Sequence, residues 1–353
     1  MKRENIQLFF AGILSSIPFS FLSFPPFIII GFYFLFKQLS FSLTKSDVLL
    51  KAFFFGFGYN LFGIHWIYFP LTFDERLVYF AMVTPIIFSL FLSLFICLPS
   101  LVTYLLMKQS FLSKYFYLKS FLISFFFYAS EFLRSKIFGG FPWNLFGHIW
   151  SFDENLIAIS KYLGVFGISF LTIFWIVLVS QNILLRKLKR SAIVFFIFPA
   201  FLFLIGISSE KKETEDSIKV RVVQPNISQE IKWSREHMRD NMEIIKKLSF
   251  KNPESLDLII WPEVAVPAFL NQSPKTIKYL SSLLPNETYL LLGSLRIEEE
   301  KIFNSLYLLS SKGVIDYYDK LKLVPFGEFI PFRNILSLKK ITDGKRDFSR
   351  GLD

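Results

Sequence analysis

The sequence predicts a multi-pass α-helical membrane domain of about seven helices over residues 1–209, followed by an α/β domain over residues 210–353. Three observations predict this division. A mean hydropathy of +0.46, with 53% hydrophobic residues, excludes a disordered or wholly water-soluble protein. Residues 1–209 contain only 7 of the 28 acidic and 16 of the 39 basic residues. Beyond a polar stretch at 208–217, strand-like and helix-like segments alternate.

Seven apolar runs are long enough, or nearly so, to cross the roughly 30 Å hydrocarbon core as helices. A tight turn at Pro25 and Pro26 separates the first two runs, and the fourth is long enough to tilt or to kink near Pro99. The first run lacks a small-residue cleavage site and continues into more apolar sequence, so it is not a cleavable signal peptide. The predicted spans are 8–23, 24–39, 50–71, 78–107, 117–133, 162–184 and 192–208.

Basic residues are distributed unequally between the two sides of these spans. With a cytoplasmic N-terminus, 12 Lys and Arg fall in inside segments and 4 in outside loops, as the positive-inside rule requires. An odd number of spans then places residues 210–353 outside, which in a bacterium is the periplasmic side of the inner membrane. Because topology explains the net charge of +11, we do not expect nucleic-acid binding.

Strands and helices are expected in turn along the second domain. The strands are predicted at 220–223, 256–260, 288–292, 303–309 and 314–318, and the helices at 228–249 and 273–284. Gly313 suits the turn between the last two strands. This order favours an α/β sheet that is buried on at least one face.

Three short motifs stand where strands end. Glu263 follows an apolar strand and is flanked by prolines, and partial burial there would raise its pKa towards that of a general base. Lys320 follows the last strand, and Glu328 comes eight residues later, after a loop shaped by Pro and Gly. The third motif, at 222–227, precedes Trp233. Taken alone, Glu263 also fits a surface side chain in a Pro-rich turn, and the third motif fits any strand exit.

Together these motifs resemble the apolipoprotein N-acyltransferases, the membrane branch of the nitrilase (carbon–nitrogen hydrolase) superfamily. The resemblance covers essentially the whole chain. It implies that residues 210–353 form part of a nitrilase-like α-β-β-α sandwich, incomplete at its C-terminus. The segments that carry the resemblance are Val223-Gln-Pro-Asn-Ile227, Lys232-Trp233, Trp261-Pro-Glu263, Asn304-Ser-Leu-Tyr307, Lys320 to Glu328, Arg134 with Gly140-Phe-Pro-Trp143 and Gly147, and Tyr162 to Leu171.

The resemblance implies a Glu–Lys–Cys triad that transfers an acyl group in two steps. Glu263 matches the general base, Lys320 the catalytic lysine, Glu328 an accessory glutamate, and Trp233 a tryptophan important to activity. This assignment is chemically reasonable, because a thiol needs a base to become a nucleophilic thiolate. A neighbouring ammonium favours the thiolate and steadies the oxyanion that follows. We expect the acid and the amine to meet from neighbouring strand ends.

The resemblance also implies the substrates. The acyl donor is a phospholipid, typically phosphatidylethanolamine, and the acceptor is the N-terminal diacylglyceryl-cysteine of an apolipoprotein. Buried acyl CH₂ groups contribute about 0.8 kcal/mol each, which a site open to the bilayer can exploit. The loop 138–150 is rich in aromatic residues, and we expect Trp143, Phe146 and Trp150 to help seat lipid. An aromatic belt at the membrane interface explains the same residues equally well.

One departure from the family concerns the nucleophile. The family's cysteine follows the catalytic lysine by some tens of residues, but none of the 33 residues after Lys320 is Cys, and the family's last span is absent too. Cys97, the single cysteine, lies inside a predicted span and is expected to be a small buried residue. We therefore expect a C-terminally truncated chain that does not form the acyl-enzyme alone. The spacing of the three His and one Cys predicts neither a metal nor another cofactor.

Three other functions remain open from the sequence. A membrane-tethered carbon–nitrogen hydrolase (an amidase) would share Glu263 and Lys320 but transfer the acyl group to water. A transporter with a soluble appendage is disfavoured, since Glu131 is nearly alone as an ionisable residue within the spans. An inactive remnant with a binding role follows naturally from the missing cysteine.

Overall fold

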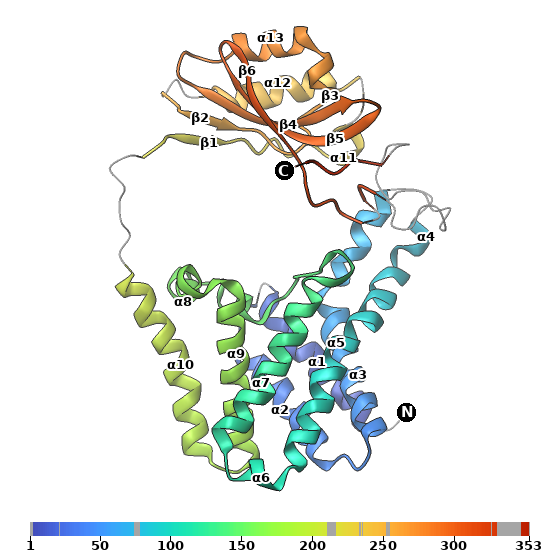
Figure 1. Ribbon diagram of the computed structural model, residues 1–353, viewed down its shortest axis with the longest axis vertical. Coiled ribbons are helices and arrows are strands. Elements are labelled where there is room, and N and C mark those ends of the chain that lie inside the picture. The colour runs from blue at the N-terminus through green and yellow to red at the C-terminus, as the bar shows by residue number, and fades with distance from the viewer. Residues whose placement is uncertain are drawn as a thin grey trace. The chain divides into compact units, whose positions relative to one another are not determined.

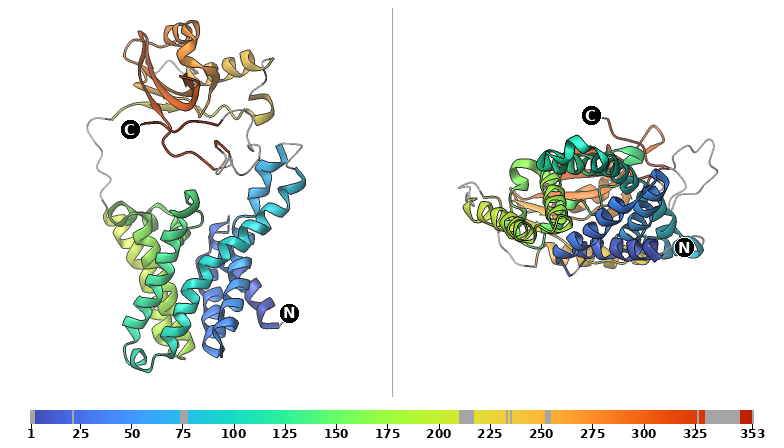
Figure 2. Two further views of the ribbon diagram at one scale, coloured as in Figure 1. Left: turned by 45° about the vertical axis from the view of Figure 1, so that its right-hand side comes forward. Right: turned by 90° about the horizontal axis from the view of Figure 1, so that it is seen from below.

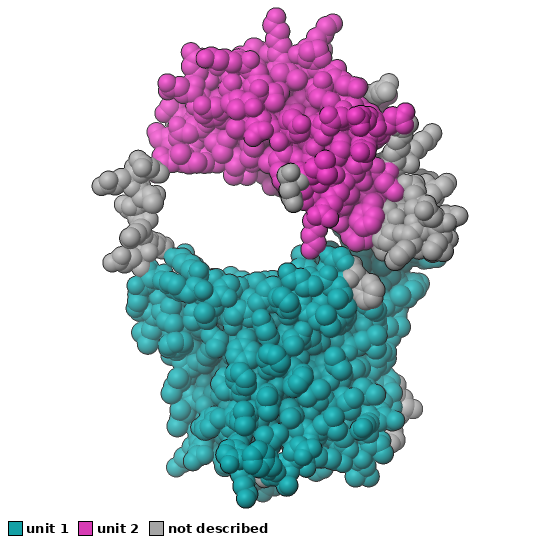
Figure 3. Space-filling view, in the orientation of Figure 1, with its two compact units in different colours: residues 1–211 teal, residues 212–353 magenta. Residues whose placement is uncertain are grey.

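The computed structural model describes residues 3–20, 22–73, 78–209, 217–232, 234, 236–251, 255–325, 327–329 and 347–352 of the chain. These residues form two compact units, Met1–Lys211 and Lys212–Asp353, which are coloured separately in Figure 3. The first unit is helical and the second is built on a sheet (Figure 1).

Helices make up the first unit. In the described residues, four are long and apolar enough to cross a membrane, or five if the bent pair of Lys45–Gly63 and His65–Thr72 counts as one span. The first two helices are shorter than such a span usually is. The seven longest helices are α1 (Arg3–Ser16), α2 (Pro26–Phe41), α3 (Lys45–Gly63), α5 (Val83–Lys108), α7 (Phe116–Arg134), α9 (Ser160–Leu184) and α10 (Leu188–Ser208).

Short helical segments connect the long ones. Pro25 and Pro26 start α2, as the tight turn predicted, and the Thr44 side chain caps α3 by accepting from the Asp47 amide at 3.2 Å. Pro99 lies inside α5. The connecting segments are η1 (Ile17–Phe19), η2 (His65–Phe73), α4 (Val78–Ala81), α6 (Ser110–Ser113), η3 (Ile137–Gly139), η4 (Phe146–Trp150) and α8 (Glu154–Ile157).

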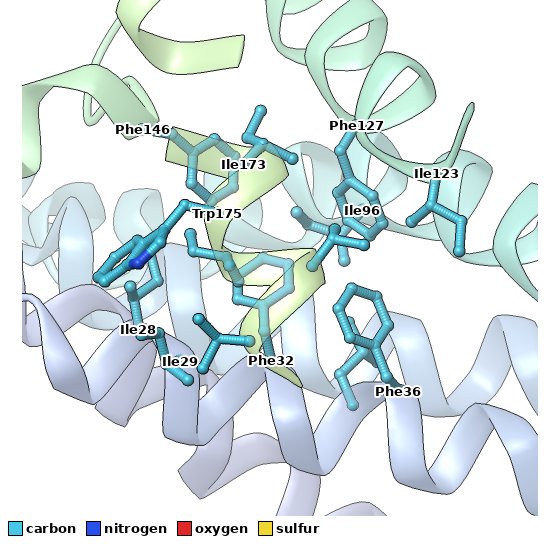
Figure 4. Close-up of a cluster of buried hydrophobic side chains, with 14 of the residues drawn as sticks. Ile28, Ile29, Phe32, Phe36, Ile96, Ile123, Phe127, Phe146, Ile173 and Trp175 are labelled. Carbon is cyan, nitrogen blue, oxygen red and sulfur yellow. The ribbon is translucent and has the colours of Figure 1, made fainter. Parts of the chain in front are cut away.

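Aromatic and aliphatic side chains together fill the centre of this bundle (Figure 4). The buried ring of Phe32 lies 5.2 to 5.6 Å from the rings of Phe55, Phe127 and Phe146, in edge-to-face geometry. Each such pair adds about 0.5–1.5 kcal/mol to the gain from burial. These buried Phe side chains therefore pack the centre of the bundle. Helices α1, α2 and α3 lie side by side in the views of Figure 2.

In the described part of the second unit, the strands form a six-stranded mixed sheet. The strands are β1 (Val220–Val222), β2 (Leu258–Ile260), β3 (Val266–Phe269), β4 (Tyr289–Glu298), β5 (Lys301–Ser310) and β6 (Gly313–Asp319). The order is β1-β2-β4-β5-β6, with β3 also paired to β4. The pairs β1–β2, β2–β4 and β3–β4 are parallel, and β4, β5 and β6 form an antiparallel meander.

In the part of the chain that the structure describes, two helices cover one face of this sheet (Figure 1). They are α12 (Met238–Ser249) and α13 (Pro274–Ser282), and a third helix, α11 (Gln229–Lys232), is short. Ile245 of α12 and Leu280 of α13 are buried with Ile259, Leu290 and Leu292 of the sheet. The sequence predicted a sheet that is buried on at least one face, and the structure agrees. The described elements amount to one sheet and one helical layer.

The sequence prediction was wrong about two details of this unit. A single helix was expected over 228–249, but α11 ends in a tight turn, in which the Ile231 carbonyl accepts from the Ser234 amide at 3.1 Å and from Asn241 Nδ2 at 3.2 Å. Strand β3 was not expected either, because its Pro267 suggested a turn, although proline is tolerated at the start of a strand.

Candidate active site

Glu263 lies in the turn between β2 and β3. Strand β2 pairs with Tyr289–Leu291 of β4, and β3 pairs further along the same strand from Ser294, so the turn runs beside β4 between them. The turn is held at its start by the Trp261 amide, which donates to the Leu291 carbonyl at 2.8 Å. Because the turn is fixed where β2 ends, the Glu263 carboxyl lies beyond the end of β2.

Gly293 of β4 lets this turn approach closely. A Cβ at that position would lie 2.5 Å from the Val264 amide nitrogen and 2.8 Å from Glu263 Cα, distances that real side chains do not reach. Any larger residue would therefore push the turn away from the sheet. Val264 itself has φ of 47°, an unusual value for a β-branched residue, which shows how tightly the turn is bent.

Lys320 follows directly after β6. Its amide donates to the Asn304 carbonyl at 2.9 Å, which extends the β5–β6 pairing by one residue. Its carbonyl accepts from the Gly351 amide at 3.1 Å. The backbone of the lysine is therefore held from two sides.

Glu328 closes a small loop that begins at Val324. The Glu328 amide donates to the Val324 carbonyl at 2.9 Å, and the Val324 amide donates back to Glu328 Oε2 at 2.8 Å. The side chain of Glu328 is only 10% exposed. Its second oxygen, Oε1, is left to face Lys320.

The three side chains come together in one cluster. Lys320 Nζ lies 2.9 Å from Glu328 Oε1 and 3.4 Å from Glu263 Oε1. Asn304 Nδ2 donates to the same two oxygens, at 3.0 Å and 2.5 Å. A single amide and a single ammonium therefore hold two carboxylates side by side, a charge-assisted arrangement that fixes all four groups.

The sequence analysis expected neighbouring strands to supply the acid and the amine. In the structure the two strands are not neighbours. Strand β5 lies between β4, which supports the Glu263 turn, and β6, which leads to Lys320. Asn304 of β5 fills the gap, so it is a residue of the candidate site that the sequence analysis missed. The Asn304-Ser-Leu-Tyr307 motif was a signal for it, but a motif alone does not show which of its side chains faces the site.

The electrostatics of the cluster stabilise both charged forms. Desolvation by burial would lower the pKa of Lys320, but the hydrogen bond to Glu328 and the charges of Glu263 and Glu328 outweigh it and raise the pKa. Burial likewise would raise the pKa of Glu328, yet hydrogen bonds from Asn304, Val324 and Lys320 prevail and lower it. The two groups are therefore a stable ion pair at neutral pH.

Glu263 is more open than the sequence analysis expected. Its side chain is 64% exposed, because it projects from the turn and is contacted by Asn304 and Lys320 rather than covered by the core. The Lys232 ammonium donates to the Glu263 backbone carbonyl at 3.0 Å. Desolvation lowers the pKa of Lys232, and the nearby charge of Glu263 opposes this. The predicted substrate-binding residue Trp233 lies outside the described residues.

The aromatic residues of the first unit differ in exposure. Trp143 is 47% exposed, with its ring 4.7 Å from that of Trp66. Phe146 is buried in the core, as Figure 4 shows, and its amide donates to Glu131 Oε1 at 2.7 Å. Trp150 is buried too and donates to Thr172 Oγ1 at 2.8 Å. Of the three, Trp143 is the one whose ring is open to a ligand.

Cys97 is buried in helix α5. Its thiol lies 3.6 Å from the Leu49 carbonyl, a contact that belongs to helix packing. The cluster of Glu263 and Lys320 belongs to the other unit. The expectation that Cys97 is a small packing residue agrees with this environment.

Known proteins match both units of the chain. A family model described as the apolipoprotein N-acyltransferase N-terminal domain matches residues 11–180, and one described as carbon-nitrogen hydrolase matches residues 219–340. The chain is 31% identical to the apolipoprotein N-acyltransferase of Rickettsia prowazekii, over 99% of this chain and 71% of the relative. It is 29% identical to that of Rhodopseudomonas palustris (81% and 57% covered) and 28% to that of Brucella suis (84% and 58%).

These matches agree with the division of the chain into two units. The long apolar helices and the bacterial relatives together indicate a membrane protein, and the relatives' shared name supports lipoprotein N-acylation in general. The match to the Rickettsia protein spans nearly all of this chain and most of that relative. The chain therefore belongs to the apolipoprotein N-acyltransferase family, as its motifs predicted.

Proposed function

We propose that the cluster of Glu263, Lys320, Glu328 and Asn304 is the acid–base part of a site that N-acylates the N-terminal diacylglyceryl-cysteine of apolipoproteins. The observation that carries this proposal is the contact of one ammonium with two carboxylates, at 2.9 and 3.4 Å, one of them open to solvent. An exposed carboxylate beside a fixed cation suits the activation of a thiol.

The first half-reaction takes an acyl group from a phospholipid such as phosphatidylethanolamine. Glu263 accepts the proton of a cysteine thiol, and the thiolate attacks the ester carbonyl. Lys320 stabilises first the thiolate and then the tetrahedral oxyanion. When the intermediate collapses, the ester C–O bond breaks, the alkoxide of the lysophospholipid takes the proton from Glu263, and a thioester remains.

The second half-reaction passes the acyl group to the apolipoprotein. The α-amine of the diacylglyceryl-cysteine attacks the thioester, and Glu263 accepts one of its protons. The C–S bond breaks and the sulfur leaves as a thiolate beside Lys320. Glu263 then gives its proton back to this thiolate. Glu328, which is buried and bonded to Lys320, keeps the ammonium in place throughout.

The thiol is proposed to come from a cysteine outside these 353 residues. Cys97 is the single cysteine of the sequence, and it is packed within helix α5 of the first unit. By this proposal the chain holds the base, the lysine and the accessory glutamate, and a thiol completes the triad.

We further propose that the first unit crosses a bacterial inner membrane seven times, with a cytoplasmic N-terminus and a periplasmic second unit. The excess of Lys and Arg in the alternate loops supports this orientation. Trp143 is proposed to contact the lipid donor, since its ring is half exposed, whereas Phe146 is buried in the core of the first unit. Trp233 is proposed to contact the substrate.

A chimera tests the proposal. The chain is fused to the segment of the Rickettsia prowazekii relative that follows the matched region, and is given phosphatidylethanolamine and a diacylglyceryl-cysteine lipopeptide. We expect an N-acylated lipopeptide by mass spectrometry, its loss in Glu263→Gln, and no product from the unfused chain. Free fatty acid without acylated peptide would instead support the hydrolase alternative. Neither product from the chimera would contradict the proposal and favour an inactive remnant.

A further inference from the structure

A second charged cluster lies on strands β4, β5 and β6. Arg296 of β4 binds Asp319 of β6 through two nitrogens: Nε lies 3.0 Å from both carboxylate oxygens, and Nη2 lies 2.6 Å from Oδ2. Ser305 of β5, between them, donates to Asp319 Oδ1 at 2.5 Å. The cluster therefore ties the three strands of the meander together at one level.

This cluster is well shielded from water. The side chains of Arg296 and Asp319 are 8% and 9% exposed. The guanidinium lies between two rings, 4.4 Å from the centroid of Phe303 and 4.7 Å from that of Tyr317. Removing one partner of such a pair leaves an uncompensated buried charge, which is strongly unfavourable. The pair therefore tolerates little change in the position of β6.

The register of β6 needs such a constraint. Among the described strands, β6 stands at the edge of the sheet, and its pairing with β5 shifts between Leu308 and Leu309. Because side chains alternate across a strand, a slip by one residue would turn every side chain of β6 to the other face. Asp319 is paired with Ser305, so the next residue, Lys320, is directed to the opposite side of the sheet, where Asn304 lies.

We propose that Arg296 and Asp319 are positioning residues, which fix the register of β6 so that Lys320 meets Glu263 and Glu328. The inference rests on the proposed function for the catalytic role of Lys320. The pair itself contacts no reacting group. It acts through the backbone of the residue that follows Asp319.

The test measures how readily the Lys320 amine reacts in the intact chain, purified in detergent. Competitive labelling with acetic anhydride at pH 9, read by mass spectrometry, gives the rate of Lys320 relative to Lys312 in the β5–β6 turn. We expect Arg296→Met and Asp319→Asn each to raise this ratio three- to tenfold, because the ammonium leaves its two carboxylates. The double variant should raise it no further. Glu298→Gln, which removes only the exposed partner of Arg296, should leave it within twofold.

Arg296→Met is the decisive variant, because its sign separates positioning from simple electrostatics. Loss of a nearby positive charge, with the geometry unchanged, would favour the ammonium form of Lys320 and slow its labelling. A faster reaction therefore requires that Lys320 has moved. An unchanged or lower ratio would overturn the inference.

Hydrogen exchange distinguishes a moved Lys320 from an unfolded second unit. In a folded variant, the amides of β4 should still exchange slowly. If Arg296→Met unfolds the second unit, Arg296→Lys replaces it, since that variant keeps the charge but cannot bind both oxygens. We expect a two- to threefold rise for it, and no rise would overturn the inference. Since labelling does not depend on turnover, an inactive chimera with the expected labelling would refute the proposed function and leave the positioning role intact.

Discussion

Replacing Asn304 with Ala should destabilise the second unit by about 2 kcal/mol. Asn304 makes two hydrogen bonds to carboxylates, and the two differ in value. Glu328 is 10% exposed, so its bond is a buried bond to a charged group, which contributes about 1.5–3 kcal/mol. Glu263 is 64% exposed, so water replaces the lost donor there, and that bond contributes less than about 1 kcal/mol.

Hydrogen exchange of the intact chain in detergent measures this loss. A change of about 2 kcal/mol speeds exchange of the β5 amides roughly 30-fold where exchange requires opening of the unit. Asn271→Ala is the matched control, since Asn271 also makes two hydrogen bonds, but these are exposed and join it to the neutral backbone groups of Ile297. The reasoning is refuted if Asn304→Ala and Asn271→Ala speed exchange equally.

Three further predictions follow from the geometry. The pKa of Glu328 is lowered in the folded state, so the stability that Glu328 contributes is present above about pH 4.3 and is lost as the pH falls further. The pKa of Lys320 is raised in the folded state, so the stability that Lys320 contributes is present below about pH 10.4 and is lost as the pH rises further. Urea unfolding across pH should show both limbs, and Lys320→Met should flatten the alkaline one. Gly293→Ala should cost about 1–3 kcal/mol by overpacking the turn, and a stability equal to wild type would contradict the close approach. Phe146→Ala should lower the stability of the helical unit by about 3–5 kcal/mol, because Phe146 is buried. Trp143→Ala should change the stability little, because Trp143 is exposed, but should weaken binding of phospholipid in vesicles. Unchanged lipid binding would remove Trp143 from the proposed site.

Much of the fold could be predicted from the sequence, because long helices and strands follow from local patterns of residues. Apolar runs of about 20 residues gave the long helices, and short runs rich in Ile, Leu and Val marked five of the six strands. Strand β3 escaped this approach since Val266-Pro-Ala-Phe269 has no clear alternation and contains a proline. The break between α11 and α12 depends on Asn241, which folds back on Ile231, a contact that no local pattern encodes.

The candidate site was predictable only in part. Glu263, Lys320 and Glu328 each stand after a strand, in motifs that signal a loop with fixed geometry. Which side chain fills the space between them depends on strand order. Because β5 lies between β4 and β6, Asn304 becomes the bridge, and the sequence does not reveal that order. The exposure of Glu263 likewise depends on how the turn leaves the sheet over Gly293.

The most direct test of the account is the covalent intermediate in the fused chain. Incubated with phosphatidylethanolamine alone, the chimera should gain the mass of one acyl group on a cysteine, as a thioester that hydroxylamine removes. Glu263→Gln and Lys320→Met should each abolish this adduct while leaving the fold intact. An adduct that forms at the same rate in both variants would contradict the claim that this acid and this amine activate the thiol.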